Sequence, residues 1–151
     1  MADRLITIDI ALFDGVDELD AVGPLEVLRR ATAAGAPFEV LLVTAGRRLE
    51  IRGASGLRLR ADRPVGYPTR VLLMPGGGWV ARNEIGAWGE ARRGTWAPTI
   101  KAATEAGALL AGVCTGTMIL AGAGAVGGRR AATHHGAWGD LAATGATLVQ
   151  D

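Results

Sequence analysis

Cysteine is nearly absent from this chain, which has a single one in 151 residues, and there are only two histidines. One cysteine excludes an internal disulfide, and these few sulfur and nitrogen donors argue against a metal site. No apolar run is long enough to cross a bilayer, and the N-terminus carries charge without a signal-peptide core. We therefore expect a soluble, cytoplasmic protein with no membrane partner and no bound metal.

An excess of charge of either sign is also missing. Sixteen lysines and arginines face fifteen aspartates and glutamates, for a net charge of +1. The basic surface expected of a nucleic-acid-binding protein is therefore absent, and we expect no such partner. Aromatic residues are scarce at 5%, while alanine and 23 glycines supply small side chains that suit close packing of helices on a sheet. The length fits one domain, spanning residues 1–151.

Apolar runs alternate with helix-like segments along the chain. Expected strands are residues 5–12, 38–43, 71–74, the run 108–111 before Cys114, and 147–149. Expected helices begin near Gly23-Pro24 and end at Gly35, and cover 98–106, 117–123 and 137–143. Residues 47–60 suggest a hairpin, whereas 86–96 show no clear pattern. The alternation predicts an α/β fold with a mainly parallel sheet between helices.

Cys114 is the best candidate for chemistry. It lies in Gly112-Val113-Cys114-Thr115-Gly116, between an apolar strand and a helix-like run. A sharp strand-to-helix turn exposes a side chain, flanking glycines give the backbone room to bend, and the following helix is expected to lower the pKa of the thiol. The alternative is a buried cysteine that serves as a small apolar side chain. We favour a nucleophile at a strand-to-helix elbow.

Two other segments, a triple glycine and an acidic loop, follow the ends of strands at the same predicted edge of the sheet. Ligands bind at this edge in open parallel sheets. Gly76, Gly77 and Gly78 follow the strand 71–74, and their amides together with that of Thr115 are expected to stabilise negative charge on a substrate. A tight chain reversal would explain the glycines equally well.

Asp17, Glu18 and Asp20 lie in the first loop and at the start of the helix that follows it. Carboxylates at a helix start often act as caps, but one that faces a thiol across a pocket also serves as general acid or base. Both interpretations stay open from the residues alone.

Three further features carry weaker predictions. Trp79, beside the triple glycine, is a candidate pocket wall, and His134-His135 suggests a surface or pocket-lining pair. Residues 122–127 match a dinucleotide-binding pattern but follow a helix rather than a strand, so we interpret them as a helix stop.

Segments 19–27, 75–78, 113–116 and 132–134 together resemble the DJ-1/PfpI family, and the resemblance covers almost the whole chain. It implies a flavodoxin-like three-layer sandwich with the cysteine at a nucleophile elbow. Members of the family continue past the strand that resembles 147–149, so the resemblance implies that C-terminal elements are missing here. Homodimers are usual in the family.

Asp20 in its Leu-Asp-x-x-Gly-Pro setting, with Thr115 after the cysteine, looks like the isonitrile hydratase branch. By that resemblance Cys114 attacks the isonitrile carbon, Asp20 and Thr115 manage the protons, and water releases an N-substituted formamide without any cofactor. The amides of Gly77 and Thr115 would match the family's anion nest, and His134 its pocket-edge histidine. The alternatives are action on glyoxal-like carbonyls, or a non-catalytic ligand- or redox-sensing domain such as those of AraC-type regulators.

Overall fold

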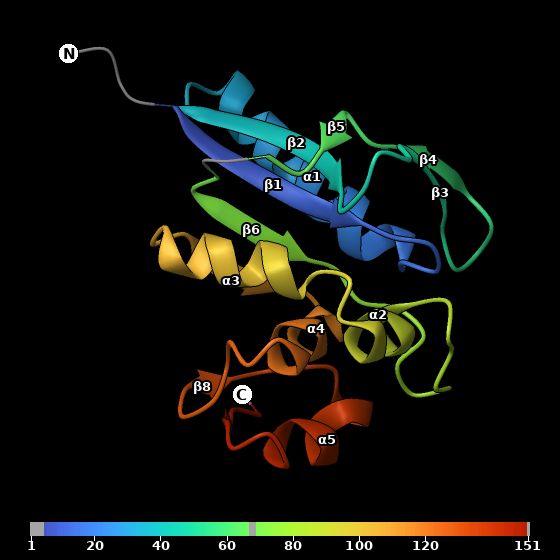
Figure 1. Cartoon of the computed structure of the whole chain (residues 1–151). Helices are drawn as coiled ribbons and strands as arrows, with labels where there is room; N and C mark the ends of the chain where they lie inside the picture. Colours follow the sequence, from blue (N-terminus) through green and yellow to red (C-terminus); the bar gives the residue numbers. More distant parts are fainter. Residues whose placement is uncertain (1–4, 67–68, 151) are drawn as a thin grey trace.

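The computed structural model describes residues 5–66 and 69–150 of the chain (Figure 1). Its central sheet has five parallel strands in the order β5-β2-β1-β6-β7. The strands are β1 (Ile6–Leu12), β2 (Phe38–Thr44), β5 (Arg63–Pro64), β6 (Val71–Met74) and β7 (Leu109–Gly112). Because neighbouring strands run the same way in register, Leu12 pairs with Thr44 and Met74 with Gly112. Their carboxyl ends therefore share one edge, as the sequence predicts.

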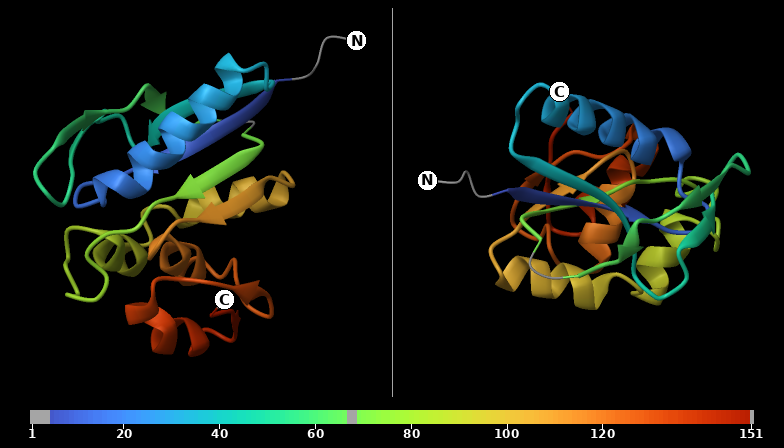
Figure 2. Two further views of the ribbon diagram at one scale, coloured as in Figure 1. Left: turned by 180° about the vertical axis from the view of Figure 1, so that it is seen from behind. Right: turned by 90° about the horizontal axis from the view of Figure 1, so that it is seen from above.

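Helices cover both faces of this sheet. Helix α1 (Glu18–Ala33) lies on one side and α3 (Ala97–Glu105) on the other, as the right-hand view of Figure 2 shows. The shorter helices α2 (Ala87–Arg93) and α4 (Gly116–Gly122) follow β6 and β7 in the chain. The predicted α/β sandwich is confirmed, and so is the helix stop at 122–127, since α4 ends at Gly122.

Smaller units complete the fold. Strands β3 (Glu50–Arg52) and β4 (Arg58–Arg60) form the expected hairpin. Strands β8 (Arg130–Ala131) and β9 (Thr147–Leu148) form a separate parallel pair, with the 3-10 turn η1 (His135–Ala137) and helix α5 (Trp138–Ala142) between them. In the part of the chain that the structure describes, no helix is both long and apolar enough for a membrane span.

Helix α1 begins earlier than Gly23-Pro24 predicts. Asp17 caps it, since its carboxylate accepts a hydrogen bond from the Leu19 amide at 3.1 Å, and Pro24 lies inside the helix. Proline has no amide hydrogen to donate to the carbonyl four residues earlier, which is that of Asp20. The sequence also gave no sign of α2 or of the two-residue strand β5, because short elements are fixed by packing rather than by periodicity.

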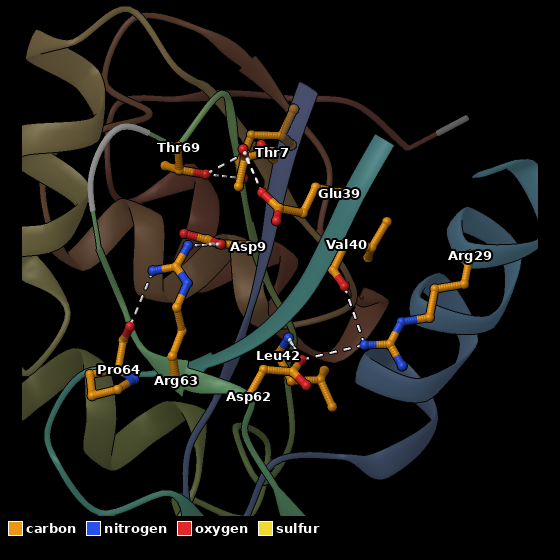
Figure 3. A network of polar contacts seen from close by, with 11 residues as sticks. Thr7, Asp9, Arg29, Glu39, Val40, Leu42, Asp62, Arg63, Pro64 and Thr69 are labelled. Carbon is orange, nitrogen blue, oxygen red and sulfur yellow. Dashed lines mark hydrogen bonds and ion pairs between the residues drawn. The ribbon is translucent and has the colours of Figure 1, made fainter. Parts of the chain in front are cut away.

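A carboxylate lies buried in the middle of the central strand β1. Asp9 is 0% exposed, and its Oδ1 accepts a hydrogen bond from Arg63 Nη2 at 3.1 Å (Figure 3). Burial raises the pKa of Asp9, while the Arg63 charge opposes that rise. The pair joins β1 to β5 across the intervening strand β2.

Candidate active site

Cys114 occupies a strained turn between β7 and α4. Its backbone φ is +54°, in the left-handed region that residues with a side chain seldom adopt. A Cβ on Gly116 would clash with the carbonyl of Met74, and one on Gly112 would clash with Thr117. The flanking glycines are therefore needed for the backbone to pass through this turn, and the half-buried sulfur stands at the carboxyl edge of the sheet.

Asp20 reaches the sulfur from the first turn of α1. Its Oδ2 accepts a hydrogen bond from the Gly76 amide at 3.2 Å, and the carboxylate also shares a hydrogen bond with the Cys114 thiol. These contacts join three predicted segments, the acidic loop, the triple glycine and the elbow. The predicted convergence at one sheet edge is therefore present.

The electrostatics of the pair differ from the expectation of a low-pKa thiolate. Burial raises the pKa of the Cys114 thiol, and the neighbouring Asp20 charge raises it further, while the Thr115 amide and hydroxyl oppose the rise. Burial likewise raises the pKa of Asp20, with the nearby Asp17 carboxylate adding to it. Helix α4 has only seven residues, so its dipole does not outweigh desolvation and the adjacent carboxylate. The expectation of a lowered cysteine pKa is wrong.

The three acidic residues have three different partners. Asp17 is the cap of α1, and its amide donates to the Gly76 carbonyl at 2.8 Å. Glu18 accepts hydrogen bonds from the hydroxyl and amide of Ser55, at 2.7 and 2.9 Å, which joins α1 to the hairpin and lowers the pKa of Glu18. Asp20 alone faces Cys114. Capping is therefore confirmed for Asp17, whereas Asp20 lies against Cys114 and its role as general acid or base stays a prediction.

The triple glycine packs too tightly to carry side chains. A Cβ on Gly76 would lie 2.5 Å from the Thr115 hydroxyl oxygen, and one on Gly77, whose φ is +127°, would lie 2.5 Å from the Asp17 amide. Gly78 has a φ of +71° and packs on Asn83. The glycines therefore serve the close approach of backbone to backbone.

Two amides of the expected anion nest are already engaged. The Gly76 amide donates to Asp20, and the Gly77 amide donates to Thr115 Oγ1 at 3.1 Å. These two amides therefore already have acceptors within the protein, and the substrate-binding role expected of Gly76, Gly77, Gly78 and Thr115 stays a prediction. The Thr115 amide faces the sulfur, as does the hydroxyl of this buried residue, whose oxygen accepts from Gly77.

Trp79 and His134 lie on the α5 side of the site. Trp79 is 7% exposed and its indole Nε1 donates to Asp140 at 2.7 Å, so it packs with the core, and its role as a pocket wall stays a prediction. His134 is half-buried, it lies close enough to Asp20 to help lower the pKa of that carboxyl, and its Nδ1 accepts from the Gly136 amide at 3.1 Å. The histidine therefore lies near Asp20, and its role at the edge of a substrate pocket stays a prediction.

Sequence reasoning missed one contact with the nucleophile. Thr133 Oγ1 donates a hydrogen bond to the Cys114 carbonyl at 3.1 Å. Thr133 belongs to the segment 132–134, which resembles the family, but the resemblance implies a role only for His134. Arg82, which joins Trp79 in binding Asp140 at 2.8 Å, was also missed, because its partner is 58 residues away in the chain.

Two observations bear on ligands. Within residues 5–66 and 69–150, no cluster of three or more histidine, cysteine or acidic side chains is placed to hold a metal ion. A cavity of about 1010 Å³ lies between the hairpin and residues 83–96, where Ile51, Ile85 and Trp96 contribute to its walls. Cys114 does not line it, so the chemistry of the elbow is separate from this cavity.

Comparisons with known proteins agree with this geometry. The sequence model of the DJ-1/PfpI family matches residues 7–151. An uncharacterized protein in the cpoL 5′ region of Streptomyces lividans is 30% identical over 127 residues, which cover 83% of this chain and 84% of the relative.

Solved structures share the fold at lower identity. A DJ-1 superfamily protein from Salmonella typhimurium, solved as a cysteine-to-alanine mutant, has a TM-score of 0.81 at 17% identity over 97% of this chain and 75% of its own. Drosophila melanogaster DJ-1beta gives 0.79 at 17% identity, covering 98% of this chain and 75% of its own. A two-domain protein from Anabaena variabilis, with DJ-1/ThiJ/PfpI-like and ferritin-like domains, gives 0.77 at 21% identity over 96% of this chain. The chain spans 40% of that protein's length.

Proposed function

Because this chain belongs to the DJ-1/PfpI family, we propose that it uses Cys114 to hydrate small isonitriles to N-substituted formamides. The observation that supports the proposal most is the hydrogen-bonded pair of the Cys114 thiol and the Asp20 carboxylate. A thiol of raised pKa needs a base at the moment of attack, and Asp20 is the carboxylate in contact with it.

The first half of the reaction forms a bond to sulfur. Cys114 passes its proton to Asp20 while the sulfur attacks the terminal carbon of R–N≡C. Asp20 then returns that proton to the same carbon, which gives a thioimidate, R–N=CH–S, on the enzyme. The amide and hydroxyl of Thr115 face the sulfur and stabilise the charge that develops on it during attack.

The second half consumes water and restores the enzyme. Water adds to the thioimidate carbon, with one proton going to the nitrogen. The remaining O–H proton passes through Asp20 to the sulfur as the C–S bond breaks, which releases R–NH–CHO and the free thiol. The sum is one isonitrile and one water giving one formamide, so water is the only co-reactant.

Turnover of a defined substrate tests the proposal. Purified protein is incubated with cyclohexyl isocyanide, and formation of N-cyclohexylformamide is followed by chromatography. We expect steady turnover in the wild type and none in Cys114→Ala. Faster consumption of methylglyoxal would instead support the glyoxalase-type alternative, and inactivity toward both compounds would support the sensing domain.

A homodimer also belongs to this proposal, since dimers are common in the family. Leu19, Val22 and Val27 of α1 are exposed to 76%, 37% and 68%, and they recur at a spacing that places them on one face of the helix. An exposed apolar stripe of this kind marks an interaction surface, which we assign to a second copy of the chain. We further propose that the chain forms one DJ-1/PfpI-like domain and that the protein is located in the cytoplasm.

A further inference from the structure

The nucleophile is tied to a part of the fold that lies outside the central sheet. Thr133 follows β8, which pairs with β9 through Arg130 and Thr147, and it precedes the turn η1. From this position its hydroxyl reaches back nineteen residues to donate to the Cys114 carbonyl at 3.1 Å. The backbone of the turn makes two further hydrogen bonds, since the Val113 amide donates to the Met74 carbonyl at 3.0 Å and the Gly116 amide donates to the Val113 carbonyl at 2.9 Å, which closes the turn around Cys114. Thr133 adds a side-chain donor on the Cys114 carbonyl itself.

The backbone of Cys114 needs such a restraint. A residue with a side chain at φ +54° is held there at a cost of about 1–3 kcal/mol, and it relaxes unless neighbouring contacts over-determine the turn. The direction of the Cys114 carbonyl is set by its own φ and by the ψ that leads into α4. A donor fixed on that carbonyl therefore opposes rotation of the very bonds that aim the sulfur at Asp20 and at the Thr115 amide.

We propose that Thr133 is a positioning residue that holds Cys114 in its left-handed conformation and so keeps the sulfur against Asp20. The inference deepens the proposed function, because it concerns the same thiol. The β8–β9 unit thus acts on the nucleophile through one hydroxyl.

Three substitutions separate positioning from general stability. Thr133→Val keeps the shape and removes the hydroxyl, whereas Thr133→Ser keeps the hydroxyl. Thr144→Val is the matched control, because the Thr144 hydroxyl donates to the Leu141 carbonyl at 2.6 Å in the same C-terminal unit but away from the elbow. With cyclohexyl isocyanide, we expect Thr133→Val to lower kcat about three- to tenfold with KM within about twofold, and Thr133→Ser to restore it.

A second readout does not need turnover. Neutralising Asp20 by Asp20→Asn is expected to accelerate alkylation of Cys114 by iodoacetamide about tenfold at neutral pH, because the carboxylate opposes thiolate formation. If Thr133 keeps the sulfur against Asp20, the same Asp20→Asn change in the Thr133→Val background produces less than about a threefold acceleration. Thr144→Val leaves the tenfold effect intact.

The outcomes distinguish the two ideas. Absence of isonitrile turnover in the wild type overturns the proposed function, while the alkylation experiment still tests Thr133. An undiminished Asp20→Asn effect in the Thr133→Val background, with thermal unfolding showing that the variant is folded, overturns the positioning role. So does a Thr144→Val variant that behaves like Thr133→Val.

Discussion

Replacing Asp20 with asparagine reverses the usual expectation for a catalytic residue, because it is expected to make the cysteine more reactive while it abolishes turnover. The Asp20 carboxylate shares a hydrogen bond with the Cys114 thiol, and both the charge and that bond raise the pKa of Cys114. Asparagine keeps the size and an acceptor oxygen but removes the charge. The thiol therefore ionises at lower pH, although the base that shuttles its proton is gone.

The size of the effect follows from one unit charge. Two charges 4 Å apart interact by about 4 kcal/mol at an effective dielectric of 20. The site is half-buried, so solvent screening reduces this value to roughly a third, or about 1.4 kcal/mol, which is a tenfold change in thiolate fraction. At neutral pH the alkylation rate is proportional to that fraction, and we expect it to rise about tenfold.

The assay is iodoacetamide alkylation of Cys114 across pH 6 to 10, followed by mass spectrometry of the intact protein. Because this is the only cysteine, the signal reports one site. Asp17→Asn is the matched control. It removes a nearby carboxylate that does not bond the sulfur, and asparagine still caps α1. We expect its alkylation rate to stay within about threefold of wild type.

A slower alkylation in Asp20→Asn would refute this reasoning. It would mean that a protonated Asp20 donates its hydrogen bond to a thiolate in the resting protein. The general base would then be another group, and the first half of the reaction would have to be rewritten.

The other predictions concern stability, packing and assembly. Arg63→Met should reduce the free energy of unfolding by about 2 kcal/mol at pH 7.5, because the buried Asp9 carboxylate loses its partner. Since the pKa of Asp9 is raised in the folded state, the folded protein binds a proton on the Asp9 carboxylate more tightly than the unfolded chain does. Stability from this group is therefore lost as pH rises, and the Arg63→Met penalty should shrink at pH 4.5 in urea titrations. Gly77→Ala should destabilise the fold by about 1–3 kcal/mol, measured the same way, because a side chain at φ +127° is strained and would meet backbone; an unchanged midpoint would contradict the close packing. The double variant Leu19→Asp with Val27→Asp should convert a dimer to a monomer in sedimentation velocity, and an unaltered dimer would place the interface elsewhere.

The sequence predicts the sheet well because buried parallel strands are marked by short apolar runs. It also predicts that the loops carrying Asp20, Gly76 and Cys114 meet, since strand ends of a parallel sheet share one edge. Both expectations depend on features that are local in the chain.

The remaining details depend on distant neighbours. Whether the Gly77 amide is free for a substrate is decided by Thr115, 38 residues later in the chain. Burial and the Asp20 charge raise the pKa of Cys114, and the short helix α4 does not offset them. No local sequence pattern indicates this outcome. The start of α1 was misplaced because proline is common in the first turn of helices, whereas here the Asp17 cap fixes the start.

The seven residues from Asp14 to Asp20 are a junction at which several parts of the fold meet. Asp14 binds Arg48 ahead of the hairpin at 2.6 Å, Glu18 binds the hairpin turn, the Asp17 amide binds the glycine loop, and Asp20 meets the cysteine. Inserting or deleting a single residue here would move these groups away from their partners and break all four contacts at once. A change of length is therefore expected to harm the fold far more in this junction, where four separate contacts depend on one spacing, than at an exposed hairpin tip.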